Sequence, residues 1–157
     1  MAGIESYGLV ILLVGLIGTA AVLSNRVSER LGAARVARLA TVSATGQPHL
    51  VPVTFAVDGD LIYIAVDHKP KTTTRLRRLA NIAANPQVTL LADHYADDWD
   101  QLWWARADGH ATVLTGPADI ASPVALLAAR YPQYQATPPA GPVIAITVTT
   151  WTAWSYT

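Results

Sequence analysis

The sequence predicts a mainly β, α+β fold: a six-stranded antiparallel barrel with appended helices. Three observations support this prediction. Short β-type segments recur along the chain, a strong hairpin signal joins two of them, and only a few stretches have helical periodicity. The predicted strands are residues 36–42, 49–57, 61–64, 88–92, 102–114 and 143–151.

The connections between these strands are short. Residues 43–46 supply a turn before the second strand, and Asp58-Gly59 is a strong hairpin signal, so the second and third strands are expected to pair. Pro52 cannot donate a hydrogen bond to a neighbouring strand, which places the second strand at an edge or breaks it on one side. An open edge can bind a ligand or a partner. Residues 107–110 form either a second tight turn or a bulge in one long strand.

Three helices are predicted between residue 24 and Tyr131. Residues 24–34 form a short amphipathic helix, and residues 72–84 place apolar side chains at i, i+3, i+4 and i+7. Ser122 and Pro123 supply an N-cap and a first-turn proline for a third helix, which runs to about Tyr131.

Composition favours one packed domain. The chain has 157 residues, 52% of them hydrophobic and 14% charged, so it contains enough apolar material for a core and is not disordered. Eleven basic and eleven acidic residues give a net charge of zero, and we therefore expect no nucleic-acid partner. The absence of cysteine excludes disulfides, thiolate metal sites and cysteine nucleophiles.

The N-terminal segment is apolar and is expected to form a helix before the domain. Residues 8–23 contain ten Leu, Ile or Val, and a 20-residue helix is about 30 Å long, enough to cross a bilayer. We therefore divide the chain into residues 1–26, a candidate membrane anchor, and residues 27–157, the domain. A buried helix and an extension from an upstream start codon are the alternatives.

The charges after this segment predict its orientation. Four arginines follow it, with Glu29 as their only acidic neighbour, and such an excess of positive charge keeps a domain on the cytoplasmic side. The domain is expected to be cytoplasmic, tethered to the inner face of the plasma membrane if residues 8–23 span it.

A basic segment precedes the second predicted helix. Residues 68–78 hold five basic side chains and no acidic one, and they include both lysines of the chain, Lys69 and Lys71. Ammonium groups, threonine hydroxyls and free backbone N–H groups at a helix N-terminus favour a phosphate. The alternative is a solvated basic turn in which Thr72 or Thr73 only caps the helix.

Tryptophans are frequent, and their spacing raises a packing problem. Trp103 and Trp104 are adjacent in a predicted strand, so they point to opposite faces and only one can enter the core. A subunit interface or a planar cofactor could cover the other, and packing against the N-terminal helix is the alternative.

Signals for other chemistries are weak or absent. His94 lies near several aspartates, but the spacing is not that of a known metal loop, and we expect no metal site. No nucleophile-elbow serine, Gly-x-Gly-x-x-Gly motif or Walker loop occurs.

Four segments together resemble a known family. Residues 34–42, 46–53, 67–71 and 76–82 are similar to the split β-barrel flavin and deazaflavin oxidoreductases related to pyridoxamine 5′-phosphate oxidase. Asp98 to Gly109 and Tyr131 to Tyr134 resemble, more narrowly, the actinobacterial branch assigned to coenzyme F420.

The resemblance implies a homodimer with the cofactor in a groove between its subunits. The ring would lie against the second and third strands, and the phosphate would be held by Lys69 and Lys71, assisted by Thr72 and Arg75. Trp99 or Trp103 from the other copy would close the pocket. The implied cofactor-binding residues are His49, Val51, Pro52, Val53, Ala65, Val66, Asp67, Lys69, Lys71, Thr72 and Arg75.

The implied function is an F420-dependent oxidoreductase that transfers hydride between reduced deazaflavin and a small conjugated organic substrate. The protein would fix orientation and distance while the cofactor carries the chemistry, so no catalytic side chain is assigned. Arg77 and Arg78 are candidates for holding the acidic tail of F420. The alternatives are an FMN-binding oxidoreductase, a non-catalytic F420 carrier or sensor, and a membrane-tethered scaffold without a ligand.

Overall fold

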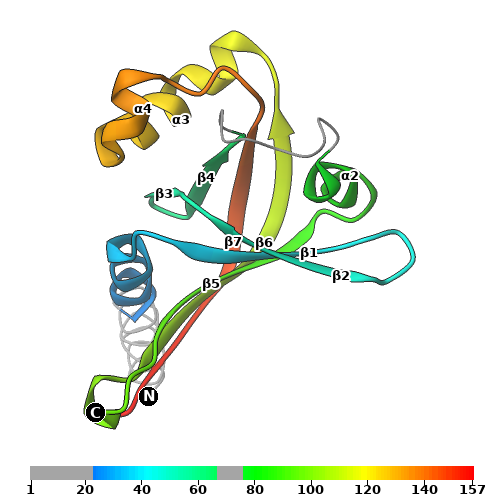
Figure 1. Cartoon of the computed structure of the whole chain (residues 1–157). Coiled ribbons are helices and arrows are strands. Elements are labelled where there is room, and N and C mark those ends of the chain that lie inside the picture. Colours follow the sequence, from blue (N-terminus) through cyan, green and yellow to red (C-terminus); the bar gives the residue numbers. More distant parts are fainter. Residues whose placement is uncertain (1–22, 67–75) are drawn as a thin grey trace, which may run out of the picture.

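The computed structural model describes residues 23–66 and 76–157, which contain a seven-stranded antiparallel sheet (Figure 1). The strand order is β2-β1-β5-β6-β7-β4-β3. The strands are β1 (Ala37–Val42), β2 (Pro48–Val53), β3 (Ala56–Asp58), β4 (Leu61–Ala65), β5 (Gln87–His94), β6 (Trp103–Leu114) and β7 (Val143–Ser155). The helices are α2 (Arg77–Ala84), the 3-10 helix η1 (Trp99–Gln101), α3 (Pro117–Arg130) and α4 (Pro132–Ala136), and residues 23–33 are also helical.

The prediction of six strands was wrong by one, because the second predicted strand is divided. Residues 49–57 form β2 and β3, and the chain leaves the sheet at Thr54 and Phe55 between them. Only β3 pairs with β4, whereas β2 pairs with β1. The predicted pairing of the second strand with the third is therefore right for β3 and wrong for β2.

The predicted hairpin turn and the predicted edge strand are both confirmed. Asp58 pairs with Leu61, and Gly59 between them has a φ of 58°, a left-handed conformation that glycine adopts without strain. Within the described sheet β2 has only β1 as a neighbour, and Pro52 lies opposite Arg38 in that ladder. A proline is tolerated there because the other side of the strand needs no donor.

The region around Gly109 is a bulge and not a turn. β6 continues through it, and its register with β7 shifts between Asp108, which pairs with Thr150, and Gly109, which pairs with Val148. Thr149 is therefore the extra residue, on β7. A Cβ at position 109 would overlap the backbone oxygen of Thr147, so only glycine allows the strands to approach this closely.

Two helix starts differ from the predictions. α2 begins at Arg77, with Leu76 as its N-cap, which is later than the predicted start at residue 72, and Thr72 and Thr73 lie outside the described residues. α3 begins at Pro117 after Gly116, and Pro123 lies buried inside the helix, so Ser122 does not start it.

The reason for the second difference is local. A proline after Gly116 supplies an equivalent first-turn residue earlier in the chain, and Pro123 then removes only one backbone hydrogen bond. The predicted end at Tyr131 is confirmed, but α4, which follows directly, was not predicted.

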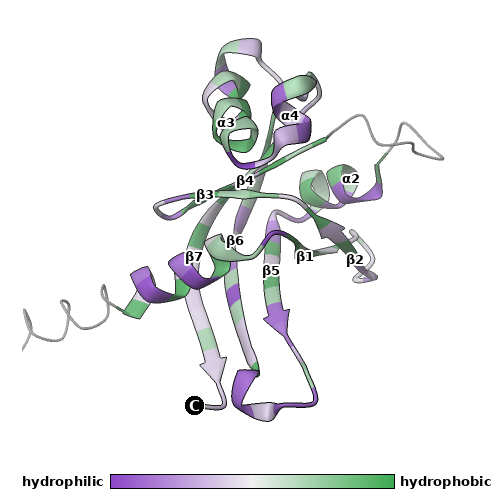
Figure 2. Cartoon of the chain, turned by 60° about the vertical axis from the view of Figure 1, so that its left-hand side comes forward, coloured by the Kyte–Doolittle hydropathy of each residue, from purple (hydrophilic) through white to green (hydrophobic). Residues whose placement is uncertain are grey.

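Buried side chains form two clusters on either side of β4. The larger one includes Leu31, Leu39, Phe55, Ile62 and Leu90, and so joins the N-terminal helix to the sheet. The smaller one lies beneath α3 and α4, which lie together at one end of the molecule (Figures 1 and 2). No helix within residues 23–66 and 76–157 is long and apolar enough to cross a membrane, and the apolar segment 8–23 of the candidate anchor lies outside the described residues except for Leu23.

Candidate functional site

The edge strand β2 has two different faces. Leu50, whose exposed fraction is 65%, lies between the exposed prolines Pro48 and Pro52 on the outer face. His49 and Val51 alternate with them and are half-buried, because successive side chains of a strand point to opposite faces. As the edge of the described sheet, β2 also leaves one row of backbone N–H and C=O groups without a strand partner.

His49 is the unusual residue of this strand. Its Nδ1 is buried and has no hydrogen-bond partner among the described residues. Burial lowers the pKa of His49 below its usual value, and the positive charges of Arg77 and Arg78 lower it further. The lowered pKa favours the neutral imidazole, whose Nδ1 makes no hydrogen bond with the described residues.

The residue opposite His49 on β1 shows how α2 is attached to the sheet. His49 lies opposite Thr41 in the β1–β2 ladder, and the Asn81 side chain of α2 donates a hydrogen bond of 2.9 Å to the Thr41 hydroxyl. Both Thr41 and Asn81 are buried. This hydrogen bond joins the middle of α2 to β1 and leaves Arg77 and Arg78, at the start of α2, close enough to His49 to depress its pKa.

The predicted site residues do not all reach this edge. His49, Val51 and Pro52 do, whereas the side chain of Val53 belongs to the larger core cluster and that of Ala65 to the smaller one. Val66 is half-buried, and its N–H donates to the carbonyl oxygen of Pro142 at 2.9 Å. The remaining predicted residues, Asp67, Lys69, Lys71, Thr72 and Arg75, lie outside the described residues.

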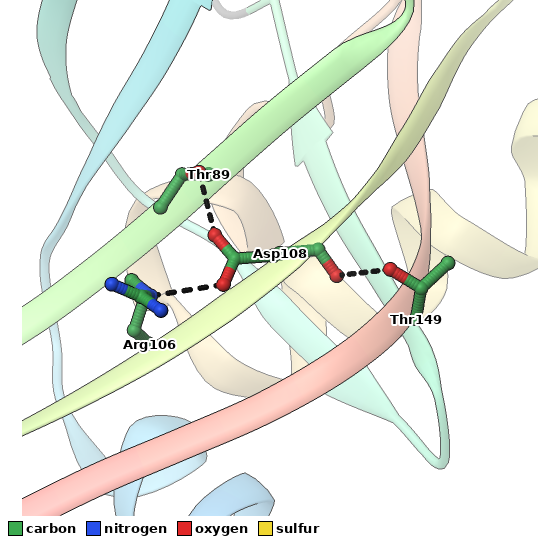
Figure 3. Close-up of polar contacts among 4 residues, drawn as sticks. All are labelled: Thr89, Arg106, Asp108 and Thr149. Atoms are coloured by element: carbon green, nitrogen blue, oxygen red, sulfur yellow. Dashed lines mark hydrogen bonds and ion pairs between the residues drawn. The ribbon is translucent and has the colours of Figure 1, made fainter.

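A polar network on the outer sheet face was not predicted. The Asp108 carboxylate accepts hydrogen bonds from the Thr89 hydroxyl at 2.7 Å and from Arg106 at 2.9 Å, and the Thr149 hydroxyl donates to the Asp108 carbonyl oxygen at 3.1 Å (Figure 3). A shallow depression of about 350 Å³ surrounds it. The sequence showed Asp108 only as a turn-type residue, because cross-strand contacts depend on register.

This network continues to the edge strand. Leu50 lies opposite Ala40, Ala40 opposite Thr89, and Thr89 opposite Asp108, so these four side chains form a row on one face of the sheet. A second ion pair, between Arg38 and Asp93 at 2.6 Å, lies on the same face. The charges on this surface are thus largely paired within the chain.

The tryptophans divide as their spacing predicted. Trp103 packs against the larger core cluster, with the Arg30 guanidinium of the N-terminal helix 5.6 Å from its ring centre. Trp104 lies on the outer face, opposite Trp154. Trp99 is 64% exposed and makes only an edge contact, at 6.2 Å, with the ring of Tyr156 among the ring contacts of the described residues. Trp103 is therefore the tryptophan that enters the core, where it also contacts the N-terminal helix, and what covers the outward-facing Trp104 stays a prediction.

The acidic loop contains the side chain that caps the helix η1. The Asp98 carboxylate caps η1 by accepting hydrogen bonds from the Asp100 N–H and from the Gln101 side chain. Within the described ranges, no three His, Cys, Asp or Glu side chains are grouped so as to hold a metal ion.

Solved structures with the same fold come from proteins of several kinds. A conserved hypothetical protein from Mycobacterium tuberculosis is 20% identical, with a TM-score of 0.67 and coverage of 83% of each chain. A FAD-binding protein from Mesorhizobium loti is 18% identical, with a TM-score of 0.62 and coverage of 85% of this chain and 92% of its own. A heme storage protein from Vibrio cholerae is 16% identical, with a TM-score of 0.63 and coverage of 85% and 94%.

Sequence comparison identifies the family. No curated protein matches the chain at a significant level. The family model described as pyridoxamine 5′-phosphate oxidase matches residues 23–155, which span the described sheet and its helices. The chain therefore belongs to the pyridoxamine 5′-phosphate oxidase family.

Proposed function

We propose that this protein is an F420-dependent oxidoreductase that transfers hydride between reduced deazaflavin and a small conjugated organic substrate. Membership of the family and the FAD-binding relative from Mesorhizobium loti support a ring-bearing redox cofactor. The choice of F420 rests on the resemblance of residues 98–109 and 131–134 to the F420-dependent branch.

The observation that carries the proposal is the buried Nδ1 of His49, which has no hydrogen-bond partner among residues 23–66 and 76–157. A buried polar atom without a partner costs about 1–3 kcal/mol, so a ligand group that hydrogen-bonds to it is favoured. Within the described sheet, the backbone groups of β2 that have no strand partner lie along the same edge, and the half-buried Val51 adds apolar surface on the face that carries His49. A flat ring with a polar rim fits this combination.

The remaining residues have assigned places in the proposal. Lys69 and Lys71 would hold the phosphate, with Thr72 and Arg75 assisting. Arg77 and Arg78 would face the acidic tail of F420, which FMN lacks. When bound, the cofactor supplies the hydride-transfer chemistry, while the chain binds it, orients it and excludes water.

The proposal includes a homodimer with the cofactor at its interface. The paired charges of the outer sheet face would not repel a second copy, and exposed apolar side chains such as Leu50 and Trp154 would be covered. Trp103 is committed to its own core, so Trp99 is the better candidate for closing the pocket of the other copy. Attachment to the inner face of the plasma membrane through residues 8–23 is a separate part of the proposal.

Equilibrium binding tests the cofactor assignment. The full chain would be titrated with F420 and with FMN, following fluorescence, and we expect tighter binding of F420. Lys71→Ala should remove a charge-assisted contact of about 1.5–3 kcal/mol, which weakens binding roughly ten- to hundredfold. Arg26→Ala, which removes an exposed positive charge from the N-terminal helix, is the matched control and should leave affinity unchanged.

Each outcome of the titration separates the alternatives. Tighter binding of FMN than of F420 would indicate an FMN-binding oxidoreductase instead of an F420-dependent one. F420 binding without oxidation of reduced F420 by any acceptor of a broad panel would indicate a carrier or sensor. Binding of neither cofactor would contradict the proposal.

A further inference from the structure

The chain changes sheet edge at two residues between β2 and β3. β2 ends at Val53 on one edge of the sheet, and β3 begins at Ala56 on the other. Thr54 and Phe55 therefore connect the two edges, and neither is in a strand. Any group that holds these two residues also holds the end of β2.

The hydroxyl of Tyr131 holds the backbone of Phe55. It lies 3.1 Å from the Phe55 nitrogen and 2.9 Å from the Phe55 carbonyl oxygen, 3.0 Å from the Arg35 carbonyl oxygen and 3.1 Å from Nε of Arg130. The hydroxyl accepts from the two N–H groups and donates to one carbonyl at a time. Tyr131 is buried, so these contacts are shielded from water.

A second tyrosine holds the neighbouring residue. The Tyr134 hydroxyl of α4 lies 2.7 Å from the Thr54 hydroxyl, and the two tyrosine rings meet edge to face at 5.6 Å. The Arg130 guanidinium lies 5.3 Å from the centre of the Phe55 ring and also donates to the Ala34 carbonyl oxygen. Arg130, Tyr131 and Tyr134 thus contact both residues of the connection between β2 and β3.

We propose that Tyr131 and Tyr134 are positioning residues that set where the free edge of β2 lies. β2 is held along one side by its ladder with β1 and from below by the core contacts of Val51 and Val53. The end of β2 next to Thr54 and Phe55 is fixed by the hydroxyls of Tyr131 and Tyr134. For the cofactor, this inference rests on the proposed function, because the ring is proposed to lie along His49 to Val53.

The reason that these tyrosines affect binding is geometric. Neither hydroxyl lies on the edge of β2, so neither needs to touch a ligand there. A shift of Thr54 and Phe55 moves the row of free backbone groups of β2 relative to the imidazole of His49. Small misplacements in a preorganised site reduce affinity and rate substantially.

A double-mutant cycle in cofactor affinity tests the proposal. Tyr134→Phe, Thr54→Val and the double variant would be titrated with F420 and FMN at a temperature where all remain fully folded. Each single change should weaken binding roughly two- to tenfold, the value of one hydrogen bond, and the double variant should be no weaker than the worse single one. Tyr156→Phe, which alters an exposed tyrosine, should leave affinity unchanged.

Amide hydrogen exchange provides a readout that needs no cofactor. Tyr134→Phe should speed exchange at residues 50–56 several-fold while exchange in β5 and β6 stays unchanged. Faster exchange confined to that segment, without cofactor binding by the wild type, would contradict the proposed function and retain the positioning role. Unchanged exchange at 50–56, or single variants that lower thermal stability while the folded proteins bind as the wild type does, would overturn the inference.

Discussion

Buried polar atoms near the two ends of β2 differ in whether they have hydrogen-bond partners among the described residues. Next to one end, the Tyr131 hydroxyl has four polar atoms within hydrogen-bond distance, two of them on the backbone of Phe55. Near the other end, Nδ1 of His49 is also buried but has no partner among the described residues. The first end is complete within the chain, whereas the second leaves an interaction for a ligand to make. Substitutions at the two ends should therefore differ in their effects on stability and on binding.

Removal of Phe55 should have the largest effect on stability. Its ring is fully buried in the larger core cluster, so Phe55→Ala should cost about 3–5 kcal/mol of unfolding free energy. Urea denaturation measures this loss. Leu50→Ala, an exposed apolar residue of β2, is the control and should change stability by less than about 0.5 kcal/mol in the free monomer. Equal losses for the two variants would contradict the burial of Phe55 and the exposure of Leu50.

Thr41→Val should have an intermediate effect. The valine keeps the shape of the side chain but leaves the buried Asn81 amide without its acceptor, which costs about 1–3 kcal/mol. Thermal or urea unfolding measures the change. Thr45→Val, at an exposed turn position, is the control for the loss of a hydroxyl. A neutral Thr41→Val would indicate that a water or another group replaces the lost bond.

His49→Leu should show the reverse pattern from Thr41→Val. Because Nδ1 has no partner to lose in the part of the chain that the structure describes, the unliganded variant should be as stable as the wild type or more stable by up to about 1 kcal/mol. Cofactor affinity should fall, which a fluorescence titration measures in parallel. A large loss of stability without a ligand would show that the imidazole already has a structural partner.

The smallest expected effect is the dependence of stability on pH. The pKa of His49 is lowered in the fold from the ordinary 6.5, so the unfolded chain takes up a proton before the folded one does. Its contribution is fully present above pH 6.5 and is lost as pH falls from there through the lowered pKa. Unfolding curves of the wild type and His49→Leu should therefore diverge as pH falls below 6.5. Parallel curves would show that the pKa is not lowered.

The sequence predicted local features of the fold well. The hairpin at Asp58-Gly59 follows from turn chemistry, and the edge position of β2 follows from the missing N–H of Pro52. The break at Thr54 and Phe55 could not be predicted, because it depends on tyrosines about 80 positions later in the chain. The start of α3 was misplaced because two prolines, Pro117 and Pro123, offer the same local signal.

The same division applies to the candidate site. The motif around His49 indicated β2, the strand on which the buried Nδ1 of His49 lies, and the alternation of β2 explains why His49 and Pro52 reach opposite faces. The sequence could not show that Val53 and Ala65 are absorbed into two different core clusters. Nor could it show the unpaired Nδ1, because an unsatisfied atom is defined by everything that surrounds it.

The most direct test of the central claim is a titration followed at the imidazole itself. The full chain, with ¹⁵N-labelled histidine, would be titrated with F420 and observed by NMR, with His49→Leu used to assign the resonance and the exposed His94 as the internal reference. We predict that the Nδ1 resonance of His49 shifts saturably with the added cofactor while that of His94 does not. Saturable binding of F420 that leaves the His49 resonance unmoved would contradict the account.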